Sequence, residues 1–259
     1  SEVDAATIAK TLSAIWMTTP QIALKVRQRI GLVLNYAEAQ SWRTSSMPND
    51  AISMLLPKQL EGGHFDAMPY KEVPAFVASL NTTLSIGRLA LLFLIFTAAR
   101  SGEVRGAKWN QIDMAERLWH RPAELMKGRT AKAHTVTLNS EALAIIEIAS
   151  QFRRNSTDLL FPSRSGGELS DMALSSFMDG IFGTPHGFRS SFRDWAAEKM
   201  PHIPDPVAEA AIAHKVSNKV VAAYKRTAFL EMRRVLLDEW GIFAGPSISL
   251  EKPDERLAV

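Results

Sequence analysis

The 259-residue sequence contains no cysteine. Disulfide bonds and thiolate zinc sites are therefore excluded, and a metal ion would have to be bound by histidines and carboxylates. Long apolar runs are absent as well: the longest, residues 89–96, is far shorter than the roughly 20 residues that a membrane-spanning helix needs. We therefore expect this run to form a buried helix, and the protein to act in the reducing cytoplasm without a membrane.

The sequence also lacks a strong excess of charge of either sign. It has 30 Lys and Arg against 27 Asp and Glu, which gives a formal net charge of +3. Its 46% hydrophobic and 22% charged residues are typical of a folded globular protein and exclude disorder of the whole chain. The slight basic excess suits a polyanionic partner but does not identify one.

Apolar residues recur at helical spacing through most of the chain. The predicted helices span residues 4–16, 20–42, 70–80, 84–96, 140–152, 171–182, 186–199, 205–214 and 217–240. Prolines and glycines interrupt the pattern between residues 43 and 69, where we place a linker. The helical period fades between residues 112 and 138. There, 118–124 and 134–138 are expected to form strands of a small antiparallel sheet, with Gly128 in their connection.

Two short motifs place cations where an anion could bind. Arg100 follows the apolar run in the stretch TAARSGE, and it must pair with a carboxylate such as Glu103, bind an anion or reach water. His186 and Arg189 lie three residues apart, on one face at the start of a predicted helix. A helix N-terminus with both groups suits a phosphate, although a capping histidine and a surface arginine would give the same pattern.

A third motif contains His214 and Tyr224, which are ten residues apart (224 − 214 = 10). On one unbroken helix of about 3.6 residues per turn, the two side chains would lie on nearly opposite faces. A turn at Ser217 and Asn218, both favourable N-cap residues, would let them converge. Taken alone, an isolated tyrosine is more often a half-buried residue whose hydroxyl group is hydrogen-bonded.

Taken together and in this order, the motifs resemble the tyrosine recombinases, in particular the integrases of prophages and genomic islands. The resemblance extends from about Thr18 to Trp240. The stretches that carry it are MPYKEVPAFVASL, TAARSGEV, HGFRSSFRDWAAE, AIAHKVSNKVVAAYKR and EMRRVLLDEW.

The resemblance implies an α+β fold that is mainly α with a small antiparallel β-sheet. Residues 1–45 would be the C-terminal part of a helical core-binding domain that contacts DNA, and 46–69 a linker. Residues 70–245 would form the catalytic domain, and 246–259 a C-terminal tail. The family's N-terminal arm-binding domain would lie outside this sequence.

The resemblance also assigns roles to residues of the motifs. Two arginines would clamp the scissile phosphate, two histidines would assist at the phosphate and at the nucleophile, one tyrosine would attack, and an acidic residue would steady the first arginine. In that order, they are Arg100 and Arg189, His214 at the phosphate and His186 at the nucleophile, Tyr224, and Glu103.

The family's lysine, which protonates the leaving 5′ oxygen, would be Lys127. Here the sequence departs from the family pattern, since the turn after Lys127 is longer than usual and Thr137 replaces a common proline. Lys132 is therefore a rival for the role. Lys25 and Arg29, on the predicted helix 20–42, are candidate DNA contacts together with Lys132, although a solvated helix face would look the same.

The implied function is site-specific DNA recombination through a 3′-phosphotyrosine intermediate, which integrates or excises a mobile element. The ester conserves the energy of the broken bond and arginines stabilise the charge, so we expect neither a cofactor nor a metal. Expected partners are double-stranded attachment sites, three further copies of the chain in a homotetramer on DNA, a directionality factor and a DNA-bending protein, all at the bacterial nucleoid. The alternatives are a type IB topoisomerase and a non-catalytic DNA-binding protein of recombinase descent.

Overall fold

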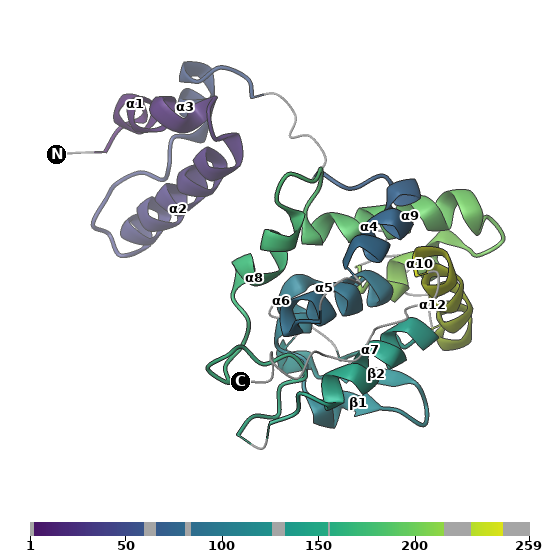
Figure 1. The fold of residues 1–259 in the computed structure, drawn as a ribbon. Coiled ribbons are helices and arrows are strands. Elements are labelled where there is room, and N and C mark those ends of the chain that lie inside the picture. The colour runs from purple at the N-terminus through teal and green to yellow at the C-terminus, as the bar shows by residue number, and fades with distance from the viewer. Residues whose placement is uncertain are drawn as a thin grey trace. The chain divides into compact units, whose positions relative to one another are not determined.

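The structure is a computed structural model, and it describes residues 3–59, 66–80, 84–125, 133–154, 156–214 and 229–245. The chain divides into two compact units, Ser1–His64 and Phe65–Val259 (Figure 1). Each unit has its own hydrophobic core.

Unit 1 contains the helices α1 (Ala5–Trp16), α2 (Pro20–Ala39) and α3 (Asn49–Leu55). The Asp4 side chain caps α1 by accepting a hydrogen bond from the Thr7 backbone N–H at 2.8 Å. Both α1 and α2 were predicted from the apolar spacing.

Helix α3 was not predicted, because Pro48 and Pro57 on either side of it suggested an irregular connection. Ile52 of α3 is fully buried, and the neighbouring Met47 and Leu56 pack in the same core as α1 and α2. Helix α3, which lies within the linker expected over 46–69, therefore belongs to unit 1.

Unit 2 is built around helix α5 (Ile86–Thr97), in which every side chain from Leu89 to Phe96 is buried. Its neighbours, visible in Figure 1, are α4 (Val73–Leu80), α6 (Ser101–Arg105), α7 (Ser140–Ser150), α8 (Asp171–Ser175) and α12 (Leu230–Ala244). The expectation of a buried helix is confirmed.

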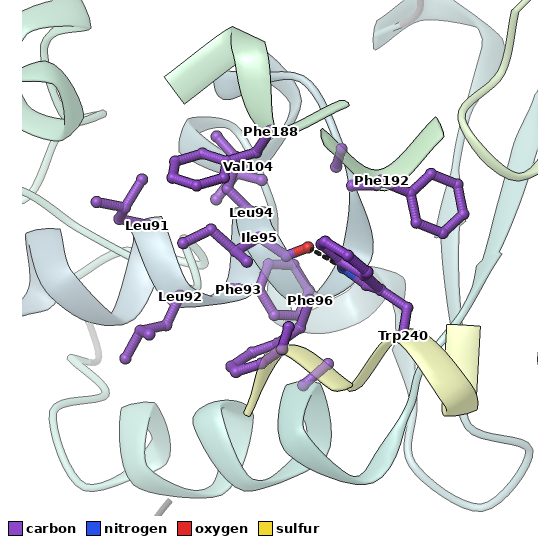
Figure 2. Close-up of a cluster of buried hydrophobic side chains, with 14 of the residues drawn as sticks. Leu91, Leu92, Phe93, Leu94, Ile95, Phe96, Val104, Phe188, Phe192 and Trp240 are labelled. Carbon is purple, nitrogen blue, oxygen red and sulfur yellow. Dashed lines mark hydrogen bonds between the residues drawn. The ribbon is translucent and has the colours of Figure 1, made fainter. Parts of the chain in front are cut away.

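Large apolar side chains pack helix α12 against α5 (Figure 2). Trp240 of α12 lies against Phe192 and donates a hydrogen bond from its indole N–H to the Ile95 carbonyl at 2.8 Å. Complete burial of one such side chain stabilises the fold by about 1.5–3 kcal/mol. Helix α12 is therefore anchored at the centre of the unit.

Three short antiparallel strands form the sheet, in the order β1 (Ile112–Asp113), β2 (Leu118–Arg121) and β3 (His134–Thr137). Strands β2 and β3 are the two that were predicted, and Arg121 is paired with His134 in their register. Gly128, expected in their connection, lies outside the described residues.

The remaining helices include α9 (Phe188–Lys199) and α10 (Asp205–Ala211). Short 3₁₀ turns complete the described part of unit 2: η1 (Tyr70–Glu72), η2 (Trp109–Gln111), η3 (Ala123–Leu125), η4 (Ser176–Met178) and η5 (Pro185–Gly187). The helix predicted over 171–182 is shorter: α8 ends at Ser175 and the 3₁₀ turn η4 follows it, and Gly180 adopts a positive φ of 75° that an α-helix does not contain.

The C-terminal part of the helix predicted over 217–240 corresponds to α12, which begins at Leu230 and ends at Ala244. The fold class is confirmed as mainly α with a small antiparallel sheet. Among the helices that the structure describes, none combines the length and the apolar character needed to cross a bilayer.

Candidate active site

The candidate site is organised by the C-terminus of helix α10. Three successive carbonyl groups there accept hydrogen bonds from side chains of other elements: Ala211 from His134 at 3.3 Å, Ile212 from Arg189 at 2.6 Å, and Ala213 from Arg100 at 3.3 Å. The last carbonyls of a helix lack partners within the helix and carry partial negative charge. They therefore suit cationic side chains.

The C-terminal end of helix α5 also provides a carbonyl group that accepts a hydrogen bond from a site arginine. The helix ends in Ala98, whose left-handed conformation (φ 48°) turns the chain and whose carbonyl accepts a hydrogen bond from Arg189 Nη1 at 2.8 Å. Ala213, after α10, adopts the same conformation (φ 53°). Two helix ends with left-handed residues thus hold the two arginines that the sequence predicted.

Arg189, in the first turn of α9, is only 3% exposed. Both of its hydrogen bonds go to carbonyl groups, and among the described residues it forms no ion pair and its Nε has no hydrogen-bond partner. Burial, with repulsion from Arg100, lowers its pKa to about 10, so the guanidinium group remains charged at neutral pH. Its positive charge is therefore available to an anion.

Arg100 is the N-cap residue of helix α6 and pairs with Glu103. Pairing with this carboxylate was one of the three alternatives that the sequence left open for Arg100. Its Nη1 donates to Glu103 Oε1 at 2.8 Å, and its backbone N–H donates to Oε2 at 2.9 Å. The side chain is still 26% exposed, whereas Glu103 is 6% exposed. Burial alone would raise the pKa of Glu103, but Arg121 and Arg100 outweigh it and hold that pKa below its usual value.

His214 follows α10 and is partly exposed, with Nδ1 at 2.9 Å from Glu209 Oε2. Burial and the nearby Arg189 lower its pKa, which favours a neutral ring that donates from Nδ1 to the carboxylate. Glu209 is held in turn by Arg193, whose Nε lies 2.7 Å from Oε1. The sequence reasoning missed Glu209, although its position five residues before the histidine was a usable signal.

His186 lies in η5 and is exposed, whereas Arg189 is buried, so the two residues differ in environment although they share a segment. Between them, Gly187 lies so close to the chain that a Cβ atom would be 2.6 Å from the Asp66 carbonyl oxygen. Only glycine fits there, which explains the second letter of the HGFR motif.

The structure does not describe every residue of the predicted site. Lys127, Lys132 and Tyr224 lie outside the described residues, as does the expected turn at Ser217 and Asn218. Lys25 and Arg29 are exposed on α2 of unit 1.

The other two tyrosines differ in their surroundings. Tyr36 is 60% exposed on α2 of unit 1. The hydroxyl group of Tyr70 is 2.6 Å from Glu198 Oε2, and this hydrogen bond raises its pKa. Tyr70 is therefore poorly suited to attack as a phenolate.

Three further residues of the site were missed by the sequence reasoning: Arg121, His134 and Arg233. Arg121 is 4% exposed and pairs with Glu103 Oε2, and Arg233 donates to the Thr135 carbonyl. Burial, with repulsion from Arg121 and Arg233, lowers the pKa of His134 to about 3. Among the described residues, no group of three or more histidines and carboxylates is arranged to hold a metal ion.

The neutral His134 makes the stability of the fold dependent on pH. Its pKa of about 3 lies below the ordinary 6.5, so below pH 6.5 the unfolded chain takes up this proton first and stability is lost as the pH falls. The loss should approach about 1.4 kcal/mol per pH unit. We expect the free energy of unfolding, measured with urea between pH 7 and 4, to fall less steeply in His134→Gln. Parallel curves would show that His134 is protonated in the fold.

Residues 67–231 match the model of the phage integrase family. The chain belongs to this family. The resemblance to prophage integrases that the motifs indicated is thereby confirmed.

Curated relatives agree with this assignment. The chain is 30% identical over 246 residues to the prophage integrase IntZ of Escherichia coli K12, covering 90% of this chain and 59% of that protein. It is 26% identical over 240 residues to the integrase of Enterobacteria phage P4, and the match covers 85% of this chain and 54% of that protein. The chain thus spans little more than half the length of these relatives.

Solved structures share the fold. A lambda integrase (75–356) dimer bound to a COC′ core site has a TM-score of 0.62 at 16% identity, covering 83% of this chain and 80% of that one. The XerH site-specific recombinase bound to difH in a pre-cleavage complex has a TM-score of 0.58 at 16% identity, and the match covers 86% of this chain and 70% of that one. At such identity, the likeness shows the fold alone.

Proposed function

We propose that this phage integrase family member is a site-specific tyrosine recombinase that cleaves and rejoins DNA through a 3′-phosphotyrosine at Tyr224. The observation that carries the proposal is the pair Arg100 and Arg189, which two helix ends hold beside each other with more positive charge than Glu103 neutralises. Unit 2 would be the catalytic domain, and unit 1 part of the core-binding domain.

The chemistry of a phosphodiester explains the two arginines. As the phosphate is attacked, negative charge gathers on its non-bridging oxygens, and planar guanidinium groups with fixed donors stabilise that charge. Arg189 is already fixed by two carbonyls, so little reorganisation is needed when the phosphate binds. This preorganisation is what stabilises the transition state more than the bound substrate.

The remaining predicted residues would complete the reaction. Tyr224 attacks the phosphate, His186 assists proton transfer at the tyrosine, and Lys127 protonates the departing 5′ oxygen. His214, oriented by Glu209, would hydrogen-bond the phosphate through Nε2. The phosphotyrosine ester keeps the energy of the broken bond, so the reverse attack by a DNA hydroxyl group needs no cofactor.

The partners would be two double-stranded attachment sites, contacted also by Lys25, Arg29 and Lys132, and other copies of the chain. The structures of lambda integrase as a dimer on a core site and as a tetramer on a Holliday junction support a tetramer on DNA. A directionality factor and a DNA-bending protein would act as accessories in the bacterial cytoplasm, at the nucleoid.

The test is to recover the DNA sites that the protein joins to itself. The protein is incubated with fragmented genomic DNA of its source organism, covalently attached fragments are sequenced, and two duplexes with the recovered site are then mixed. We expect strand exchange only between matched sites. Relaxation of supercoiled DNA without exchange would instead identify a topoisomerase, and binding without attachment a non-catalytic protein.

Loss of either clamping arginine should slow cleavage strongly. We expect Arg100→Ala and Arg189→Ala each to reduce the single-turnover cleavage rate by at least about 100-fold, as for other preorganised transition-state donors. Arg105 lies on the same helix as Glu103 but pairs with Asp171. The variant Arg105→Ala therefore serves as the control, and we expect it to cleave DNA at the wild-type rate. A rate within a few fold of wild type in either arginine variant would remove that residue from the site.

A further inference from the structure

Glu103 binds two arginines with its two oxygens. Oε1 accepts from Arg100 Nη1 at 2.8 Å, while Oε2 accepts from the Arg100 backbone and from Arg121 Nη1. Arg100 reaches Glu103 from its own helix, but Arg121 comes from the end of strand β2. The carboxylate is thus held from two elements.

Arg121 is fixed as firmly as the carboxylate that it binds. It is 4% exposed, its guanidinium group lies 5.1 Å from the centre of the Trp119 ring, and Trp119 itself is hydrogen-bonded to Gln111 at 3.1 Å. A side chain so buried cannot reach across to the backbone of bound DNA. Its influence on a phosphate must therefore pass through the groups that it touches.

The charge balance indicates what that influence is. Glu103 is the only carboxylate, among the described residues, that forms an ion pair with either Arg100 or Arg121. A buried carboxylate shared between two guanidinium groups neutralises each of them only in part. With Arg121 removed, Glu103 could pair with Arg100 through both oxygens, which would turn the guanidinium group and reduce its net charge.

We propose that Arg121 is a positioning residue, which holds Glu103 so that Arg100 is oriented toward the scissile phosphate and keeps a net positive charge. The role rests on the proposed recombinase function. Arg121 acts on the step in which charge develops on the phosphate, and it contributes little to the binding of DNA.

The first experiment separates the cleavage step from DNA binding. In Arg121→Met, we expect single-turnover cleavage by saturating protein to slow by about tenfold or more, comparable to the effect of losing a residue that orients a metal ligand. The Kd for DNA should change by less than about twofold, since Arg121 does not contact the backbone. Wild-type cleavage, or an equal loss in binding and cleavage, would overturn the proposal.

Two further variants control for structure and charge. Arg105→Met removes another arginine, which donates to the Leu169 carbonyl at 2.8 Å from the same helix as Glu103, and it should cleave normally. Arg121→Lys retains the charge and should recover part of the rate. Equal slowing in the Arg105 and Arg121 variants would assign the defect to general loss of packing, against the proposal.

The second experiment does not depend on cleavage. Glu103 carboxyl groups labelled with ¹³C are titrated by NMR, and the pKa of Glu103 should rise in Arg121→Met, because Arg121 pairs with this carboxylate and is the largest cause that lowers its pKa. The Arg100 Nε–H signal should shift in the same variant.

An unchanged Glu103 pKa and Arg100 signal would overturn the positioning role, even if the wild-type protein proves not to cleave DNA. Absence of cleavage in wild type, with both shifts observed, would count against the recombinase function alone.

Discussion

Replacing Tyr224 with phenylalanine is expected to abolish covalent attachment to DNA completely while leaving the affinity for DNA unchanged. Only the hydroxyl oxygen is lost, and this oxygen is the proposed nucleophile, so neither the fold nor the phosphate contacts should change. Attachment is measured by denaturing gel electrophoresis of protein incubated with a nicked duplex, and affinity by a filter-binding or anisotropy titration.

The other two tyrosines provide the controls for this prediction. Tyr36→Phe alters an exposed residue of unit 1, and Tyr70→Phe removes the hydrogen bond to Glu198, so both should form the covalent complex at close to the wild-type rate. Attachment that persists in Tyr224→Phe and disappears in one of these variants would move the nucleophile to that residue.

Replacing Lys127 with alanine is expected to slow cleavage of ordinary DNA by about 10²- to 10⁴-fold, the range for loss of a general acid. The same variant should be near wild type on DNA with sulfur in place of the bridging 5′ oxygen. A thiolate leaves readily without a proton, so the sulfur substrate needs no general acid. The comparison therefore isolates proton transfer from all other effects of the substitution.

Lys132→Ala is the matched control, because it removes the same charge from the same connection between β2 and β3. We expect a smaller loss, equal on the two substrates, since Lys132 would act only by contacting DNA. Rescue of Lys132→Ala alone by sulfur would exchange the roles of the two lysines and would require the longer turn to bring Lys132 to the phosphate.

Local spacing predicted much of the fold. The buried helix α5 followed from its uninterrupted apolar run, and the ion pair between Arg100 and Glu103 was one of the alternatives that the sequence left open for Arg100. Helix α3 was missed because the prolines on either side of it suggest an irregular connection, and its seven residues are too few to show a clear helical period. Its place was decided by the packing of Ile52 in the core of unit 1, which no local pattern reveals.

The parts of the site that escaped prediction depend on contacts between distant segments. Arg121 reaches Glu103 across 18 residues and His134 reaches the Ala211 carbonyl across 77, so neither contact leaves a periodic signal. The left-handed conformation of Ala98 was equally hidden, because alanine seldom adopts it without support from tertiary structure. Sequence reasoning thus named the residues of recognisable motifs and, apart from Glu103, missed the groups that hold them.

The most direct test of the account is to identify the residue that becomes joined to DNA. The wild-type protein is trapped on a nicked duplex in the presence of EDTA, digested with protease and nuclease, and the modified peptide is sequenced by mass spectrometry. The account predicts a 3′-nucleotide on Tyr224, formed without divalent metal because arginines stabilise the charge. A modified residue other than Tyr224, or attachment that appears only when magnesium is added, would contradict it.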